Sequence, residues 1–268
     1  MLPDGGLDSD AIFAAAREGK IASLSLFGVN PVLNAADGPA VREALEKTPF
    51  VVVSDLFLTE TAQLATLVLP AKGAFEKTGT TMNLAGDLLP VNKSLDAPEG
   101  VLSDLEMLVG LAAQLDVAMP TAEEVNDAVI ERAVKPLDVR FGDARYASQA
   151  LTPKAADTGG LRVALQSRIF AGGGTSVNDD RIAELRPLPE AAIAPAEAAR
   201  LGVEMGDYVD LLSATQTMHD LLIEVRPGMP EGTIALIGGL PDDPANIFGA
   251  NARVNVQNIR KSHTLVEA

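Results

Sequence analysis

The 268-residue sequence predicts an α/β protein, with a doubly wound parallel-sheet domain followed by a β-barrel domain. In the first half, short apolar runs alternate with segments of helical periodicity, which is typical of βαβ units. From Leu161 the apolar residues recur at every second position between glycine and proline turns, which favours a barrel. We therefore expect a first domain at 1–135, a linker rich in glycine and proline at 136–160, and a second domain at 161–268.

The first domain should begin with helices and strands in alternation. A helix is expected from Asp8 or Ser9 through Arg17, ended by Gly19, and another is expected to begin at Pro39. Apolar runs between and after these helices predict strands, and we expect them to be buried on both faces, as in most parallel sheets. These strands are expected at 21–27, 50–53 and 66–69.

Two capping boxes mark the starts of later helices. Ser103 with Glu106, and Thr121 with Glu124, each place a hydroxyl three residues before a glutamate. We interpret both helices as packing helices. The inner stripe expected for the first is Leu105, Leu108, Val109, Ala112 and Leu115.

The second domain should contain short strands and one helix. Pro195–Leu201 has helical character and is followed by Gly202. Alternating apolar residues predict five strands, at 161–166, 208–212, 221–225, 233–237 and 253–257.

Composition excludes several kinds of chemistry. The chain has no cysteine, so it offers no thiolate for an iron–sulfur cluster and no disulfide. Its net charge of −16 makes nucleic acid an unfavourable partner, because phosphate contacts need lysine and arginine. No apolar run is long enough to span a membrane, and the N-terminus lacks the pattern of a signal peptide. We therefore expect a cytoplasmic location.

Candidate site residues follow the expected strands. Gly28, Asn30 and Pro31 come after the first strand, and Asp55, Thr59 and Glu60 come after the second. Open α/β sheets bind ligands at the carboxyl ends of their strands, and a helix N-terminus there suits an anion. Asp55 and Glu60 could form an acid–base pair, but we favour a role for Glu60 in stabilising a helix dipole.

Other candidate ligand-binding features are weaker. Gly172 and Gly173 lie in a glycine-rich loop that could cradle a phosphate, although a flexible loop is the preferred interpretation because no P-loop lysine follows. Neither His219 nor His263 has a second ligand at metal spacing, so no metal site is expected. The nearest cations for a pyrophosphate are few, namely Lys72, Lys77, Arg168 and Arg181.

Several motifs together resemble one family. Asp55-x-Phe-x-Thr-Glu-Thr-Ala, then Ala-x-x-Val-Leu-Pro70, then Glu76-Lys-x-Gly-Thr-x-x-Asn-x-x-Gly86, are similar to the molybdopterin oxidoreductase superfamily. Gly28-Val-Asn-Pro31 resembles its Gly-Ala-Asn-Pro loop. The segment from Ile193 to Val209 is similar to its C-terminal dinucleotide-binding domain, which implies a double-psi barrel. The resemblance implies a vestigial site for the pterin nucleotide at Gly28, Asn30, Pro31, Asp55, Thr59, Glu60, Gly172 and Gly173.

Within the superfamily, the chain looks most like the large iron–sulfur subunit of NADH:quinone oxidoreductase, also called chain 3 of respiratory complex I. That resemblance implies a C-terminal segment with a structural and assembly role in electron transport. It implies no catalytic residue or cofactor in this chain. Its partners would be other subunits or the N-terminal cluster-bearing region, on the inner face of the plasma membrane. Two alternatives stay open: the C-terminal half of a formate dehydrogenase-like molybdenum enzyme that binds molybdopterin guanine dinucleotide, and a free-standing nucleotide-binding module.

Overall fold

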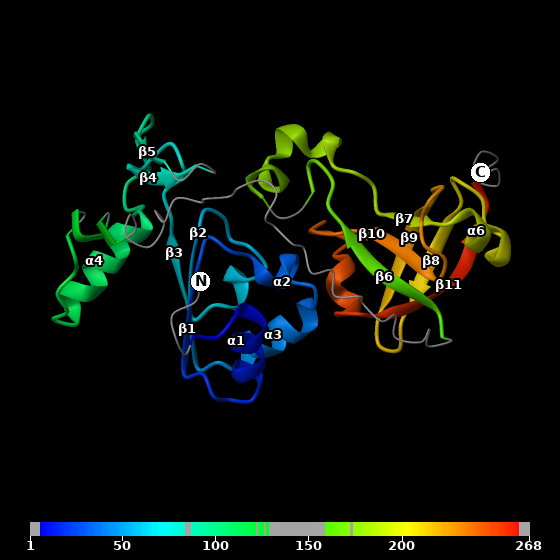
Figure 1. Ribbon diagram of the computed structural model, residues 1–268, viewed down its shortest axis with the longest axis horizontal. Helices are drawn as coiled ribbons and strands as arrows, with labels where there is room; N and C mark the ends of the chain where they lie inside the picture. Colours follow the sequence, from blue (N-terminus) through cyan, green and yellow to red (C-terminus); the bar gives the residue numbers. More distant parts are fainter. Residues whose placement is uncertain are drawn as a thin grey trace, which may run out of the picture. The chain divides into compact units, whose positions relative to one another are not determined.

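The computed structural model describes residues 6–83, 87–121, 123–125, 127–128, 159–171 and 174–262. It is a mixed α/β structure with a parallel strand pair and a closed six-stranded barrel (Figure 1). The chain divides into two compact units, one made of 1–68 and 157–268 and the other of 69–156. The expected domain boundary at 135 and the linker up to residue 158 lie outside the described residues.

The first unit opens with a βαβ segment. Its elements are α1 (Ser9–Arg17), β1 (Ser23–Phe27), α2 (Pro31–Asn34), α3 (Gly38–Lys47), β2 (Phe50–Asp55), the 3₁₀ turn η1 (Ala62–Leu64) and β3 (Leu67–Pro70). The sheet order is β1-β2-β3, and β1 runs parallel to β2 from Ser23 opposite Phe50 to Phe27 opposite Ser54. The predicted helices α1 and α3 are confirmed, with α1 capped by Asp8, whose carboxylate accepts a bond from the Ala11 amide at 2.8 Å. The one-turn helix α2 was not predicted.

Burial on both faces of these strands was a wrong expectation. In β1 the residues Ser23, Ser25 and Phe27 are exposed, and Leu24 and Leu26 pack on the core. In β3, Leu67 is 45% exposed. Figure 1 shows α1, α2 and α3 on one side of β1 and β2. Side chains of a strand alternate between faces, so one covering layer buries every second residue. The core so formed contains Val32, Val41, Leu45, Val51, Val53 and Ala62.

The second unit contains a hairpin and a helix among its described residues. β4 (Gly79–Met82) pairs antiparallel with β5 (Leu88–Val91), and α4 (Asp104–Gln114) follows. The predicted capping box is confirmed: the Glu106 amide donates to Ser103 Oγ at 3.2 Å, and the Ser103 amide donates to Glu106 at 2.6 Å. The reciprocal bonds of Thr121 and Glu124 are also present.

The expected inner stripe of α4 is largely exposed. Ala112 is buried, but Leu105 is 63% exposed and Leu115 is 64% exposed. Leu108 and Val109 are also exposed, whereas Met107, outside the predicted stripe, is buried. Helical periodicity shows where an apolar face lies on a helix, but it does not show what covers that face.

The first unit closes with the barrel. Its strands are β6 (Leu161–Gln166), β7 (Glu190–Ile193), β8 (Tyr208–Leu212), β9 (Thr217–Val225), β10 (Thr233–Ile237) and β11 (Arg253–Arg260). They close in the order β10-β6-β11-β8-β9-β7. Pairs β10–β6 and β7–β9 are parallel, and the other pairs are antiparallel. The helix α6 (Pro195–Leu201) and the strands β6, β8 and β10 have their predicted bounds, while β7 was not predicted.

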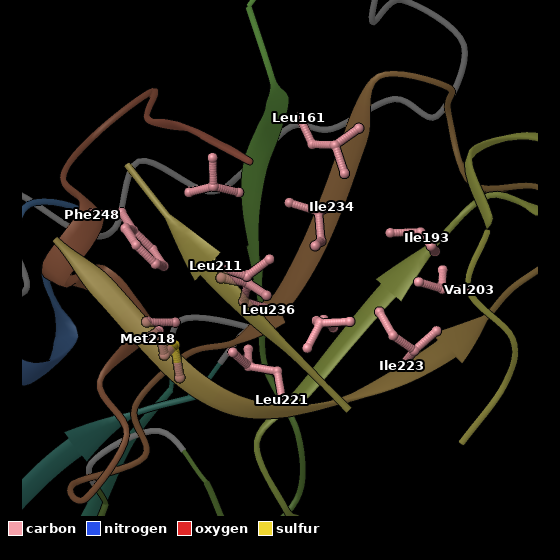
Figure 2. Close-up of a cluster of buried hydrophobic side chains, with 14 of the residues drawn as sticks. Leu161, Ile193, Val203, Leu211, Met218, Leu221, Ile223, Ile234, Leu236 and Phe248 are labelled. Atoms are coloured by element: carbon pink, nitrogen blue, oxygen red, sulfur yellow. The ribbon is translucent and has the colours of Figure 1, made fainter. Parts of the chain in front are cut away.

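Aliphatic side chains fill the barrel (Figure 2). Inward-facing leucine and isoleucine from four strands are fully or almost fully buried, and each stabilises the fold by about 1.5–3 kcal/mol relative to an exposed position. These residues are Ile193, Leu211, Leu221, Ile223, Ile234 and Leu236. In β9 the spacing of buried residues changes from Met218 to Leu221, at Asp220, whose φ is +57°. The irregular β8–β9 pairing lets both segments of β9 face the core.

The segments η2 (Thr175–Asn178), η3 (Asp180–Leu185) and η4 (Ala245–Phe248) are short 3₁₀ turns attached to the barrel. Phe248 of η4 belongs to the barrel core. Within the described residues, no helix is both long and apolar enough for a membrane crossing.

Candidate functional site

The carboxyl ends of β1 and β2 bring two polar loops together, as the sequence predicts. The Gly28 amide donates to the Ser54 carbonyl at 2.8 Å and so continues the pairing of the two strands. Gly28 has φ +60°, a conformation that glycine adopts without a steric cost. The chain then turns into α2, with Asn30 as its N-cap residue and Pro31 at its first position.

Asn30 is the centre of a buried hydrogen-bond network. Its Nδ2 donates to Glu60 Oε2 at 2.7 Å. Its Oδ1 accepts from Thr61 Oγ1 at 2.7 Å and from the Thr61 amide at 3.3 Å. Thr61 Oγ1 in turn accepts from the Val32 amide at 3.2 Å, so the first turn of α2 is included. Because Asn30 is 6% exposed and Thr61 is fully buried, these bonds replace water for groups that could not remain unpaired.

Glu60 and Asp55 have separate partners. Glu60 accepts from Asn30, whereas Asp55 Oδ1 accepts from the adjacent Leu56 amide at 2.7 Å. The preferred role of Glu60 at a helix N-terminus is corrected by this contact. The turn that follows is only a three-residue 3₁₀ segment, and Thr59 Oγ1 accepts from its Ala62 amide at 3.2 Å. A segment this short has little dipole to stabilise.

Six of the eight predicted site residues lie in these two loops, and Gly172 and Gly173 lie outside the described residues. Sequence reasoning did not select Thr61, although its hydroxyl connects Asn30 to α2. The available signal was a second threonine immediately after Glu60, in a segment that is otherwise apolar.

All four cations noted near the loops are paired with carboxylates. Lys72 lies 2.7 Å from Glu106, and Lys77 lies 3.4 Å from Asp104. Arg181 forms a bidentate contact with Asp179 at 3.0 Å. A pyrophosphate would have to compete with these carboxylates for each cation.

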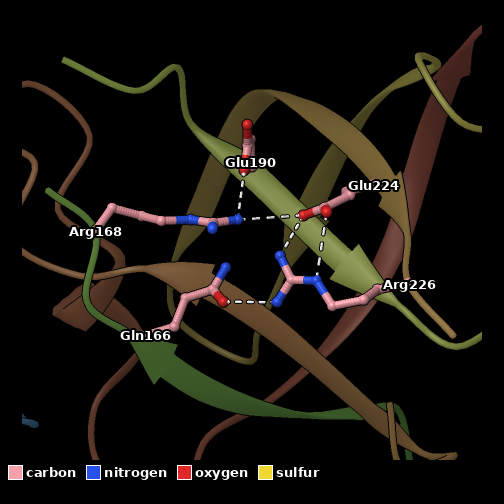
Figure 3. Close-up of polar contacts among 5 residues, drawn as sticks. All are labelled: Gln166, Arg168, Glu190, Glu224 and Arg226. Atoms are coloured by element: carbon pink, nitrogen blue, oxygen red, sulfur yellow. Dashed lines mark hydrogen bonds and ion pairs between the residues drawn. The ribbon is translucent and has the colours of Figure 1, made fainter. Parts of the chain in front are cut away.

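Arg168 belongs to a larger charge-balanced cluster on the barrel (Figure 3). It contacts Glu190 at 3.3 Å and Glu224 at 3.4 Å. Arg226 also binds Glu224, and its Nη1 donates to Gln166 Oε1 at 2.9 Å. Two guanidinium groups and two carboxylates therefore neutralise each other across β6, β7 and β9, which makes this cluster a cross-strand brace rather than an open anion site.

His219 is paired with a carboxylate. Its Nδ1 lies 3.1 Å from Asp210, a 5% exposed residue that also accepts from Arg260 and Asn258, each at 2.8 Å. The Arg260 guanidinium and the other donors hold the pKa of Asp210 well below its usual range, despite the opposing effect of burial. Across the described residues, no group of three or more histidine, aspartate or glutamate side chains has an arrangement that could hold a metal ion.

Comparison with known sequences identifies the segment that carries the two loops. The sequence model for molybdopterin oxidoreductase matches residues 4–114. Residues 4–114 belong to the molybdopterin oxidoreductase family. The predicted resemblance is confirmed, and both loops of the candidate site lie inside this molybdopterin oxidoreductase segment.

The sequence relatives of this molybdopterin oxidoreductase segment fall into two groups. F420-dependent formate dehydrogenase 1 subunit alpha of Methanococcus maripaludis is 34% identical over 127 residues, covering 46% of this chain and 19% of that protein. The NADH-quinone oxidoreductase subunit of Rhizobium meliloti that is named G 2 is 27% identical over 245 residues, covering 85% of this chain and 29% of that protein. NADPH-Fe(3+) oxidoreductase subunit alpha of Geobacter sulfurreducens is 28% identical over 239 residues, covering 84% and 28%. The chain thus spans less than a third of each of these relatives.

A solved structure supports the fold of both the segment and the barrel. Acetylene hydratase from Pelobacter acetylenicus superposes with a TM-score of 0.61 at 17% sequence identity. The match covers 94% of this chain and 46% of the hydratase. At this identity the likeness concerns the fold and not the reaction.

Proposed function

We propose that this chain is the C-terminal, molybdopterin-oxidoreductase-like segment of an NADH:quinone oxidoreductase large subunit, with a structural and assembly role. The observation that carries the proposal is the extent of two alignments. The matches to the NADH-quinone oxidoreductase subunit of Rhizobium meliloti and to NADPH-Fe(3+) oxidoreductase subunit alpha each cover more than four-fifths of the chain. In contrast, the formate dehydrogenase match covers less than half of it.

The candidate site supports a structural role because its polar groups bind each other. Asn30 uses its amide nitrogen for Glu60 and its amide oxygen for Thr61. A ligand that used Asn30 would first have to break a buried hydrogen bond, which costs about 1–3 kcal/mol. The cations that could hold a pyrophosphate are also already paired. These loops therefore suit a vestigial site better than a functioning one.

The same proposal extends to cofactors, partners and location. With no cysteine, the chain has no thiolate for a cluster, so we place any redox centre in other parts of the complex. Its partners would be a cluster-bearing N-terminal region and neighbouring subunits. The assembly would lie in the cytoplasm at the inner face of the plasma membrane. We also propose that the barrel is of the double-psi type and that the first sheet belongs to a doubly wound fold. The two parallel strand pairs of the barrel and the parallel β1–β2 pair support these assignments.

The experiment is affinity purification of the tagged chain from its native cells, followed by identification of its partners and metal analysis. We expect a multisubunit oxidoreductase in which iron depends on the presence of the partners. The chain purified alone should contain neither iron nor molybdenum in stoichiometric amount. Recovery of the chain alone, or stoichiometric molybdenum in it, would contradict the proposal.

A second candidate is the C-terminal half of a formate dehydrogenase-like enzyme that binds molybdopterin guanine dinucleotide. The higher identity of the shorter alignments favours it: 38% over 110 residues with F420-dependent formate dehydrogenase 2 subunit alpha, also of Methanococcus maripaludis. Calorimetry with a guanine dinucleotide distinguishes the two candidates. The structural proposal predicts weak or undetectable binding, whereas a dissociation constant at or below about 1 μM, roughly −8 kcal/mol, would favour the enzyme.

A further inference from the structure

A residue of the barrel reaches the helix that begins at the candidate site. Asn246, in η4, donates from Nδ2 to the Val32 carbonyl and to the Ala35 carbonyl, both at 2.9 Å. The residues joined by the first bond are 214 positions apart in the sequence. Asn246 is 3% exposed, so water cannot easily replace either bond.

The carbonyls that Asn246 binds are those that a helix cannot satisfy by itself. The last carbonyl groups of any helix lack an intrahelical donor. In α2, which has only four residues, Val32 and the C-cap residue Ala35 are at that end. One primary amide nitrogen carries two N–H groups, so a single asparagine side chain can cap both carbonyls. Asn246 therefore acts as a C-cap supplied by the barrel.

The chain leaves space for this cap by placing glycines around it. A Cβ on Gly38 would lie 2.8 Å from Asn246 Nδ2 and 2.9 Å from the Val32 carbonyl oxygen. Both distances are shorter than side-chain contacts allow, so a larger residue would push η4 and α2 apart. On the other side, a Cβ on Gly249 would lie 3.3 Å from the carboxylate of Asp37, which caps α3 at the Ala40 amide. The close approach of η4 to the α2–α3 turn thus depends on both residues.

We propose that Asn246 is a positioning residue, which fixes α2 to the barrel and thereby sets the geometry of the Asn30 network. Asn30 is the N-cap of the helix whose C-terminal end Asn246 holds. At about 1.5 Å per residue, these two ends are too close for one to move without the other. The barrel therefore controls the strand-end loops through one side chain, whether or not a ligand binds there.

The test is amide hydrogen exchange on the whole chain with Asn246→Asp. This substitution keeps the side-chain volume but turns an oxygen toward the two carbonyls. We expect exchange at the amides of Val32 and Thr61, which bond within the Asn30 network, to become on the order of tenfold faster. The amides of β8 and β11 should keep their protection. Asn255→Asp is the matched control, because it adds the same charge at an exposed position in the barrel.

Two results would overturn the proposal. If exchange accelerates equally in β8 and β11, Asn246 merely stabilises the barrel. If it accelerates nowhere, the cap does not position the loops. Asn246→Ala replaces the aspartate variant should that chain fail to fold.

A double-mutant cycle gives an independent readout. Gly38→Ala places a methyl group against Asn246 from the opposite side, so it should cause the same local acceleration at Val32 and Thr61. Because both changes break one contact, the variant that carries both should exchange about as fast as the faster single variant. Multiplied effects would show that the two residues act separately, which would also overturn the proposal.

Discussion

Asn30 donates its side-chain amide to Glu60 at 2.7 Å and so connects the loop after β1 to the loop after β2. The residues lie 30 positions apart, and neither side chain bonds to its own strand in this contact. Thr61, the residue next to Glu60, accepts and donates in the same network. The two strand ends are thus joined by side chains as well as by the β1–β2 ladder.

The first prediction concerns this network. Asn30→Ala leaves the Glu60 carboxylate and the Thr61 hydroxyl without their shared partner in a buried place. We expect a loss of about 1–3 kcal/mol in the free energy of unfolding, measured by urea denaturation. Asn34→Ala, at an exposed position of α2, is the control and should change stability by less than about 0.5 kcal/mol. Equal effects of the two substitutions would mean that the network adds no stability.

The second prediction concerns acid. Bonds from Arg260 and its neighbours lower the pKa of Asp210 in the folded chain below the value of about 3.9 for a free aspartate. The unfolded chain therefore takes up this proton first, so Asp210 stabilises the fold at neutral pH. This contribution is lost as the pH falls below about 4 and toward the folded pKa.

The corresponding experiment compares urea unfolding at about pH 7 and about pH 3, on either side of the ordinary aspartate pKa. Asp210→Asn should be less stable than the natural chain at neutral pH, and the difference should shrink in acid. Asp10→Asn, at an exposed position, is the control for removal of one negative charge. A stability difference that does not depend on pH would contradict the role given to Asp210.

Local signals in the sequence predicted the elements whose determinants are local. The capping box of Ser103 and Glu106 marks the start of α4, and Pro195 with Gly202 marks the bounds of α6. The polar residues at the ends of β1 and β2 also came together as predicted, since the ends of parallel strands lie at one edge of a sheet.

Features that depend on distant partners could not be predicted in this way. β7 contains Ala191 and Ala192, which have little strand preference, and it forms by pairing with β9 and β10. The role of Thr61 depends on Asn30, and the role of Asn246 depends on carbonyls that lie 214 and 211 positions away. The apolar runs of β1 and β3 were overinterpreted because a run of leucine and valine does not reveal whether one or two layers cover a sheet.

The third prediction joins sequence composition to the Asn246 contact. The glycine and proline content of 136–160 predicts that limited proteolysis cuts there first. The two fragments should still elute together in gel filtration, because Asn246 holds α2 to the barrel. In the Asn246→Asp variant the fragments should separate more readily. Early cleavage within 50–90 would show instead that the core has been misplaced.

The last prediction concerns the exposed face of α4. Leu105, Leu108, Val109, Leu111 and Leu115 are each at least 41% exposed, and exposed apolar clusters of this kind mark interaction sites. The net charge of −16 opposes contact between copies of the chain, and salt screens that repulsion. We therefore expect the isolated chain to self-associate more strongly as salt increases.

Sedimentation at low and high salt measures this effect. Leu105→Lys with Leu115→Lys should abolish association at both salt concentrations, because the charges would have to be buried in the contact. The matched control is Leu188→Lys with Met205→Lys, which adds the same charge at exposed apolar positions of the barrel unit, 60% and 64% exposed. This control should associate as the natural chain does, apart from the change in net charge. In the native complex a partner subunit would cover the α4 face, so co-expression with the cluster-bearing region should raise the melting temperature. A clean monomer at both salt concentrations, with no stabilisation by that region, would contradict this role for α4.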